Sequence, residues 1–230
     1  MPKLTLIDRN AFVRALVICL VVLVLLHVAV ITVYYPQLFD TSRPSLLKLF
    51  FLDQETNIPS FFNTLLLLIT AASAYFIYVL KKKSKQPTFH WLLICFLFLF
   101  LALDETISIH ERVNLLIYNK GWRSDGFFKF LWIVPYLLLA LVFLLSSLSL
   151  LRSLPAKTRN GFLLAGTIYV AGAAGFEMIG GKIIDTRGMD NMLYIISASV
   201  EEMLEMTGLI IFIYYLLDYL ETELANLQHK

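Results

Sequence analysis

The chain has 230 residues, of which 59% are hydrophobic and 16% charged, and its formal net charge is +2. Soluble domains average roughly 45–50% apolar and about 25% charged residues, so both fractions are displaced toward an apolar environment. This composition excludes a disordered chain and an ordinary soluble globule, and the small net charge leaves no basic surface for a nucleic acid. It predicts an integral membrane protein.

Six apolar runs are long enough to cross a bilayer, which takes about 20 residues. They cover residues 12–34, 58–80, 89–110, 127–151, 161–183 and 191–218. Runs of this length without alternation favour helices over strands. Because the remaining loops are too short to fold separately, residues 1–230 are predicted to form one all-α domain, a bundle of six transmembrane helices. The first run is too long and too poor in small residues at its end to be a cleaved signal peptide, so it is predicted to be a retained helix.

Lysine and arginine predict the orientation of the bundle, because these residues are enriched in cytoplasmic loops. With the amino terminus inside, 11 of them fall on the inner side and 8 on the outer side, and the run Lys81–Lys85 is the densest group. Both termini are therefore predicted to be cytoplasmic, in a multi-pass protein of the inner (plasma) membrane surrounded by lipids. The tail from Asp218 onward is expected to continue the last helix. An oligomer is left open.

Acidic residues recur in or beside four of the predicted spans, and all of them fall in the same outer half of the bilayer. A charged side chain at the centre of a spanning helix costs roughly 2.5–3.5 kcal/mol on insertion scales, so each one needs a reason to be there. The set is Asp53, Glu55, Asp104, Glu105, Glu111, Glu177, Glu201, Glu202 and Glu205. This convergence is the strongest signal in the sequence.

In the third span, helical geometry separates the acids into two directions. At about 100° per residue, Asp104, Ser108 and Glu111 fall on one stripe of a continuous helix. Glu105 lies about 100° away from Asp104 and close in angle to Arg112, so these two residues are expected to form a pair.

In the last span, Ser197, Glu201, Glu205 and Gly208 share one stripe through their spacing of four residues, while Glu202 lies to the side. The fifth span surrounds Glu177 with small residues, which allow close helix packing and direct this acid toward the bundle interior.

The charges at this depth do not balance, because Arg112 and Lys182 are the obvious cations near nine acids. Two carboxylates about 6 Å apart repel by roughly 3 kcal/mol at an effective dielectric constant near 20. The cluster is therefore expected to hold protons, water or a bound cation.

A bound divalent metal ion is the leading interpretation of this imbalance. Oxygen-rich ligation with one or two imidazoles suits Fe or Mn best, and Zn or Ca are alternatives. The predicted ligands are Asp104, Glu105, His110, Glu111, Glu177, Glu201 and Glu205. Additional candidates are Glu55, Glu202 and His27. The competing explanations are protonated acids that join helices, capping of the second span by Glu55, and packing of His27 as a neutral imidazole.

Two resemblances to known proteins rest on short motifs. The string Leu103-Asp104-Glu105 followed by His110-Glu111 resembles a group of uncharacterised bacterial multi-pass membrane proteins with an LDE-x4-HE motif, which implies no known activity. The same Leu103-Asp104-Glu105, together with Phe61-Phe62-Asn63-Thr64, is similar to stretches of the alkaline ceramidase superfamily of membrane zinc hydrolases. The three zinc-binding histidines of that family have no counterparts here and six spans replace seven, so its activity is not carried over.

The sequence thus predicts an intramembrane metal site open to the outer side. Metal-dependent catalysis, by an oxidoreductase or a hydrolase acting on a lipid or another small substrate, is the first functional hypothesis. The second is a cation- or proton-coupled transporter or channel that uses the same acids, although no internal repeat supports it. The third is a structural membrane subunit. The Glu-x-x-His pairs of ferritin-like di-iron proteins are absent.

Overall fold

The computed structural model describes residues 8–34 and 46–228, in which helix is the regular secondary structure. The spanning helices are α1 (Arg9–Tyr34), α2 (Ile58–Lys83), α3 (Phe89–Ile107), α5 (Ile133–Ser153), a continuous segment of α6 (Ala156–Val170), η4 (Ala171–Phe176) and α7 (Glu177–Arg187), and α8 (Met192–Gln228). Outside these spans lie η2 (Leu46–Phe50), α4 (Ile109–Asn119) and η3 (Gly126–Phe128).

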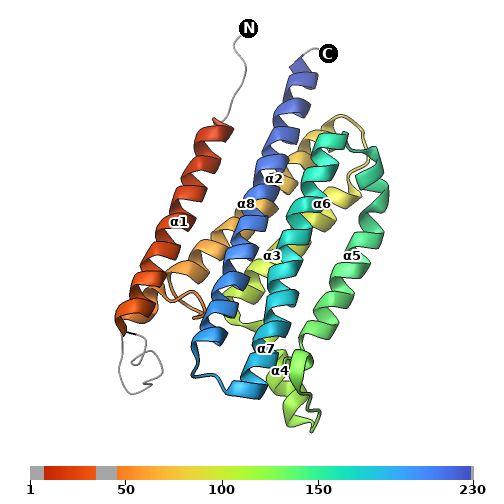
Figure 1. The fold of residues 1–230 in the computed structure, drawn as a ribbon. Coiled ribbons are helices and arrows are strands. Elements are labelled where there is room, and N and C mark those ends of the chain that lie inside the picture. The colour runs from red at the N-terminus through yellow and green to blue at the C-terminus, as the bar shows by residue number, and fades with distance from the viewer. Residues whose placement is uncertain (1–7, 35–45, 229–230) are drawn as a thin grey trace.

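Within the described ranges, six helices are long and apolar enough to cross a membrane, with mean hydropathies between 1.5 and 3.2 over their most apolar windows. The spanning helices run along one common direction, and the start of α1 and the end of α8 lie at the same end of the bundle (Figure 1). The predicted all-α bundle of six membrane helices is confirmed. Which side of a membrane this end faces stays a prediction.

The core of the bundle lies around α2 and α8, which pack against each other. Helix α3 covers another side of α2, and α6 packs along α8. Fully buried side chains such as Leu66 of α2 and Ile213 of α8 fill the space between them. By contrast, α5 exposes a long apolar face that includes Leu138 and Leu145, as expected for a helix surrounded by lipid.

Glycines bring the continuous α6–η4–α7 segment close to α8 at three levels. A Cβ atom at Gly161 would lie 2.3 Å from the ring of Tyr215, and one at Gly172 would lie 2.8 Å from the carbonyl oxygen of Glu201. Gly208 of α8 has no room for a Cβ either, because it lies against the backbone of α6. Small residues thus let these backbones approach closely. The π-helical turn η4 directly precedes Glu177, and such turns are common at functional sites.

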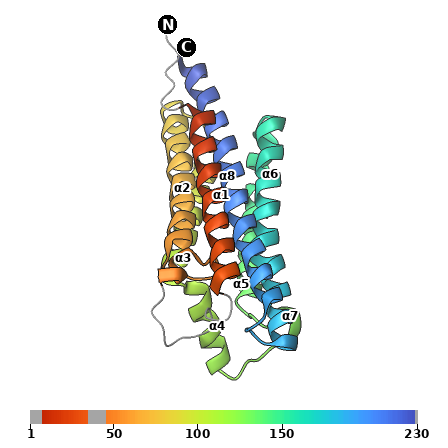
Figure 2. The ribbon, with the colours of Figure 1, turned by 60° about the vertical axis from the view of Figure 1, so that its left-hand side comes forward.

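The end of α3 differs from the sequence prediction, and this difference shapes the candidate site. The predicted span continues to residue 110, but α3 ends at Ile107 because Ser108 adopts a left-handed conformation with φ 53° and ψ 52°. A separate helix, α4, then begins at Ile109 and extends from the lower end of α3 (Figure 2). The stripe of Asp104, Ser108 and Glu111 expected for a continuous helix is therefore broken.

Other boundaries moved by a few residues. The fourth span begins at Ile133 instead of residue 127, because η3 and a short turn occupy the intervening segment. The fifth span covers 156–187 and the last one continues to Gln228, so the expected extension of the last helix beyond Asp218 is confirmed.

Candidate metal centre

Acidic side chains from one loop and four helices gather at the end of the bundle opposite the termini, which we call the acidic end. Asp53 and Glu55 come from the loop before α2, and the others come from the end of α3, the start of α4, the start of α7 and the first half of α8. Glu55, Glu177, Glu202 and Glu205 each have at least two of the other acids as neighbours. Sequence segments far apart along the chain thus meet here.

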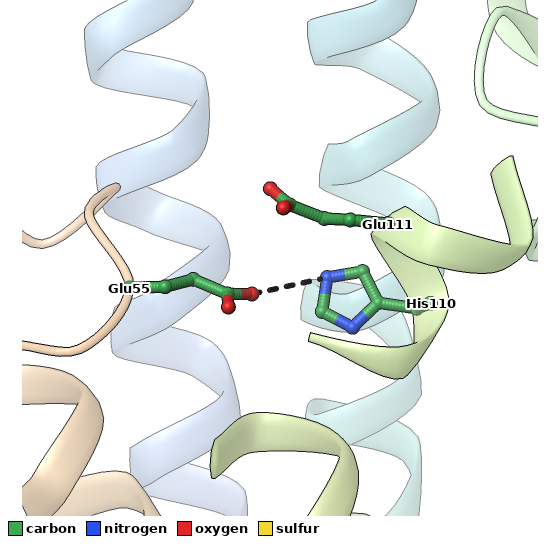
Figure 3. Close-up of side chains that lie close together, drawn as sticks. All are labelled: Glu55, His110 and Glu111. Atoms are coloured by element: carbon green, nitrogen blue, oxygen red, sulfur yellow. Dashed lines mark ion pairs between the residues drawn. The ribbon is translucent and has the colours of Figure 1, made fainter. Parts of the chain in front are cut away.

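One group of three side chains has the geometry of a metal site. Figure 3 shows Glu55 from the loop and His110 and Glu111 from the first turn of α4 pointing toward one another. One potential ligand atom from each residue lies within 4.8 Å of the other two. The Nε2 atom of His110 is 3.5 Å from Oε1 of Glu55. The second carboxylate oxygen of Glu55, Oε2, is buried and has no hydrogen-bond partner among the described residues.

Asp104 holds His110 in this orientation from behind. Its Oδ1 accepts the backbone N–H of His110 at 2.8 Å, and its Oδ2 lies 3.3 Å from the ring atom Nδ1. In the neutral imidazole, a proton on Nδ1 that is donated to this carboxylate leaves the lone pair on Nε2, which faces Glu55. Metal-binding histidines commonly have such a carboxylate on their second nitrogen. Asp104, predicted to be a ligand, therefore lies where it positions a ligand.

The break between α3 and α4 produces this arrangement. Because Ser108 turns the chain out of the α3 direction, the first N–H groups of α4 face the last turn of α3, where Asp104 accepts one of them. The same turn separates Glu105 from Arg112, whose Nε donates instead to the carbonyl oxygen of Ile107 at 2.9 Å. The expected Glu105–Arg112 pair is thus absent from the described side chains.

Trp132 connects His110 to the deeper acids. Its ring centroid lies 4.8 Å from that of His110, and the two planes are inclined by 49°. Its Nε1–H donates to Oε1 of Glu177 at 3.2 Å. The Trp132 ring packs on the imidazole of His110, and its N–H binds the Glu177 carboxylate. Trp132 thus links the positions of His110 and Glu177.

The ionisation of the loop and α4 groups reflects this crowding. Burial, together with the nearby negative charge of Glu111, raises the pKa of Glu55 to about 7, although His110 opposes this shift. Burial and the neighbouring Glu177 raise the pKa of Asp53 to about 7. Burial alone would lower the pKa of His110, but the hydrogen bond and charge of Asp104 and the charge of Glu55 outweigh it and raise the pKa to about 9.

The remaining acids lie deeper and form their own contacts. Glu105 faces Ser60 and Asn63 of α2. Glu177 and Glu201 face each other. Glu202 and Glu205 both have Glu105 as the strongest charged neighbour. None of these five acids joins the group of Glu55, His110 and Glu111 in the part of the chain that the structure describes.

Glu202 lies in the interior of the bundle although it stands to the side of the predicted stripe. Helical angles place it to the side of the stripe, yet it faces Glu105 from α3 and Glu205 from its own helix. The reason is that α8 is covered by α2 on one side and by the α6–η4 segment on the other, so more than one of its faces is interior.

His27, an additional ligand candidate, belongs to a different network. Its Nδ1 accepts the backbone N–H of Leu52 at 3.1 Å, and its Nε2 lies 2.7 Å from Oγ of Ser199. The Ser199 hydroxyl donates in turn to the carbonyl oxygen of Ile195 at 2.6 Å, so the imidazole is the donor to Ser199. With both nitrogens engaged in the buried core, His27 joins α1, α8 and the loop before α2.

Comparison with known proteins identifies a family without a described activity. The model for a family described as "Domain of unknown function (DUF8692)" matches residues 14–220. The chain belongs to this family. The match extends from α1 into α8 and so contains the complete acidic end. No curated protein and no solved structure matches the chain.

Two residues at the acidic end were not among the predicted site residues. Trp132 is typical of the aromatic belt of a membrane protein, and nothing in the sequence around it indicates its contact with His110. Asn63 offered a clearer signal, because it is a polar amide inside the apolar run of α2 one turn after Pro59. Its side chain is completely buried.

Proposed function

We propose that this membrane protein binds a divalent transition metal through Glu55, His110 and Glu111 and uses it for catalysis on a lipid or another small substrate. The observation that carries the proposal is the orientation of His110. Asp104 occupies the back of the imidazole, so that Nε2 faces Glu55 at 3.5 Å in the group that also includes Glu111.

The ligand set indicates the kind of metal. Two carboxylates and one imidazole suit Fe or Mn, with Zn as an alternative, whereas Ca and Mg are bound mostly by oxygen. Catalytic metal sites typically have three protein ligands and keep a position for water or substrate. Glu111 is exposed, while Glu55 and His110 are half-buried, so the proposed metal would be reachable from outside the bundle.

The distribution of apolar residues supports catalysis over transport. Beyond the acids, the middle of the bundle is filled by buried apolar side chains from α2, α3 and α8, among them Leu66, Leu67, Ala102 and Ile213. A second apolar cluster around Trp91 follows toward the end with the termini. A transporter would need a polar route through this region. A site at one end of a bundle with these apolar clusters beyond it fits an enzyme that receives its substrate from that side.

Metal analysis of the purified full-length chain tests the proposal. After loading with Fe and removal of free metal, the wild type is expected to keep about one Fe ion per chain that His110→Ala and Glu111→Gln lose. Matched controls are His90→Ala and Glu221→Gln, because His90 bonds Ser149 and Glu221 pairs with Arg9, both away from the acidic end. Equal metal content in all variants would contradict the proposal.

We also propose that the acidic end faces the outside of the inner (plasma) membrane, with both termini in the cytoplasm. The excess of lysine and arginine on the terminal side supports this orientation. A reporter fused after Lys85 is expected to report a cytoplasmic location, and one fused after Arg123 an external location. Reversed signals would place the candidate metal site on the cytoplasmic side.

A further inference from the structure

A second group of polar side chains lies deeper than the Glu55–His110–Glu111 group. It consists of Asn63 from α2, Glu105 from α3, and Glu202 and Glu205 from α8. The amide of Asn63 faces both Glu105 and Glu205. Three helices that pack against one another, α2 with α3 and α2 with α8, thus contribute to one polar group inside an apolar bundle.

Asn63 has an unusual environment in this group. Its side chain has 0% of its surface exposed, and neither Nδ2 nor Oδ1 has a hydrogen-bond partner among the described residues. Buried polar groups are almost always hydrogen-bonded, and leaving an amide without a partner is costly. The Asn63 amide thus lies close enough to both carboxylates to act on them, yet no polar atom of the described residues lies at ordinary hydrogen-bond distance from it, so the buried amide needs a further partner.

The charge of the group indicates that the missing component is positive. The groups that act most strongly on Glu202 are Glu105, Glu205, Asp53 and Glu55, all of which are acids. His110 acts on Glu105 and Glu205 from the first group, whereas two other basic side chains of this end point elsewhere. Arg112 is exposed and donates to the carbonyl oxygen of Ile107, and Lys129 lies 3.7 Å from Asp185. Buried carboxylates that face one another need a cation or protons.

The spacing and the donor types indicate which cation fits. Apart from the amide nitrogen of Asn63, the candidate ligand atoms of these side chains are oxygens. Hard divalent cations prefer oxygen ligands. Among the described residues, these acids do not bring three ligand atoms within the 4.8 Å that encloses the His110 group. A bare ion would therefore not contact all of them. Mg²⁺ loses water reluctantly and usually keeps part of its water shell, so it can be held by more widely spaced carboxylates.

We propose that Asn63, Glu105, Glu202 and Glu205 form a second cation site, which holds a hydrated divalent cation of the magnesium type. The carboxylates accept hydrogen bonds from the water shell and supply negative charge. With the ion bound, the Asn63 carbonyl oxygen would accept a hydrogen bond from a metal-bound water, and its amide N–H groups would donate to Glu105 and Glu205. This site is separate from the transition-metal site at His110, from which it differs in depth, donor set and spacing.

Mn²⁺ titration of the full-length protein followed by electron paramagnetic resonance tests the proposal, with Mg²⁺ as competitor. The measurement uses the His110→Ala background, in which the first site is removed. This background is expected to bind one Mn²⁺ that Mg²⁺ displaces. Adding Glu202→Gln or Asn63→Leu is expected to weaken that binding by roughly 10- to 100-fold. Glu221→Gln, on the same helix at the other end, is the control and is expected to leave it unchanged.

Asn63→Asp distinguishes a bound cation from shared protons. It also provides a test if the Asn63→Leu variant does not fold. A fourth carboxylate is expected to tighten Mn²⁺ binding severalfold if a cation is held there, whereas a proton-sharing cluster gains no cation affinity. The proposal is overturned if Mn²⁺ does not bind in the His110→Ala background, or if Glu202→Gln and Asn63→Asp both leave the affinity unchanged. Failure of the His110 site instead appears as unchanged stoichiometry on going from wild type to His110→Ala.

Discussion

The two ends of α8 carry the same type of acidic side chain in opposite surroundings. At the end with the termini, every described ion pair joins an acid of α8 to a base of another helix. Arg9 of α1 contacts Asp218 and lies 3.1 Å from Glu221. At the acidic end, Glu201 faces Glu177 and Glu202 faces Glu105, so acids meet acids.

The ion pairs at the terminal end join four helices. Lys157 of α6 lies 2.9 Å from Asp218, and Lys81 of α2 lies 2.7 Å from Glu223, while Arg9 brings in α1. Here the charges compensate one another and hold the bundle together. The acidic end has His110 as its main positive partner and keeps an excess of carboxyl groups over basic groups. A protein retains such an excess where function requires it, because it costs stability.

The largest effect on stability is expected from breaking a pair at the terminal end. Lys81→Met leaves Glu223 mostly buried without its partner, and removing one member of a buried pair costs about 3 kcal/mol. The melting temperature in detergent should fall by several degrees. Glu202→Gln in chelator is the matched change at the acidic end. It removes like-charge repulsion and should raise the melting temperature or leave it unchanged. Equal destabilisation by both changes would remove the contrast between the two ends.

The next largest effect is expected on metal affinity, from the residue that orients His110. Asp104→Asn replaces the carboxylate on Nδ1 by a neutral amide, which holds the imidazole less firmly in the required tautomer. Loss of such a partner typically costs 10- to 100-fold in metal affinity, which a competition assay with a chromogenic chelator can measure. Asp185→Asn is the control, because Asp185 accepts the Gly126 N–H at the same end. Unchanged affinity in Asp104→Asn would contradict the positioning role.

A smaller effect is expected from pH, and its sign depends on the metal. In the metal-free protein, raising the pKa of Glu55 from 4.5 to about 7 means that stability falls as the pH rises between these values. For His110, whose pKa is raised from 6.5 to about 9, the contribution is complete below pH 6.5 and lost as the pH rises through 9.

With metal bound, the ligands must be deprotonated, so stability should fall as the pH drops. Melting temperatures measured from pH 5 to 9 with and without chelator check this reversal. His110→Ala should reduce the fall between pH 7 and 9 in the metal-free series. Identical curves with and without chelator would speak against a bound metal.

The smallest effect is expected at the contact between the two groups of acids. Trp132→Phe keeps an aromatic ring beside His110 but removes the donor to Glu177, which should cost about 1 kcal/mol of stability. Retained metal at His110 together with a slightly lower melting temperature is the expected result. Trp122→Phe, at an exposed tryptophan of the same end, is the control.

Short-range signals in the sequence were sufficient to predict the helical bundle and the depth at which the acids lie in it. Hydropathy over about 20 residues is a local property, so six spans could be predicted with modest errors at their ends. The positions of the acids within these spans showed that they lie at one depth. The sequence could not predict which acids contact one another, because residues at one depth can still face different neighbours.

Single backbone features decided the groups. The prediction treated residues 89–110 as one helix, and the left-handed Ser108 changed the direction of everything after it. His110 thereby came to lie against Asp104, and Glu55, an additional ligand candidate with capping as its alternative role, became its neighbour. His27, which the sequence left open as a ligand, proved to have both nitrogens engaged.

The sequence by itself determined that this protein is a six-helix membrane bundle with an excess of carboxylates at one level, because the cost of burying charge and exposing apolar surface acts residue by residue. The tertiary structure decided which of those carboxylates faces an imidazole, which faces an unpaired amide, and which face only one another. Those contacts depend on the close approach of α2, α3 and α8 and on one turn at Ser108, and the direction of a side chain between packed helices is set by its neighbours in space.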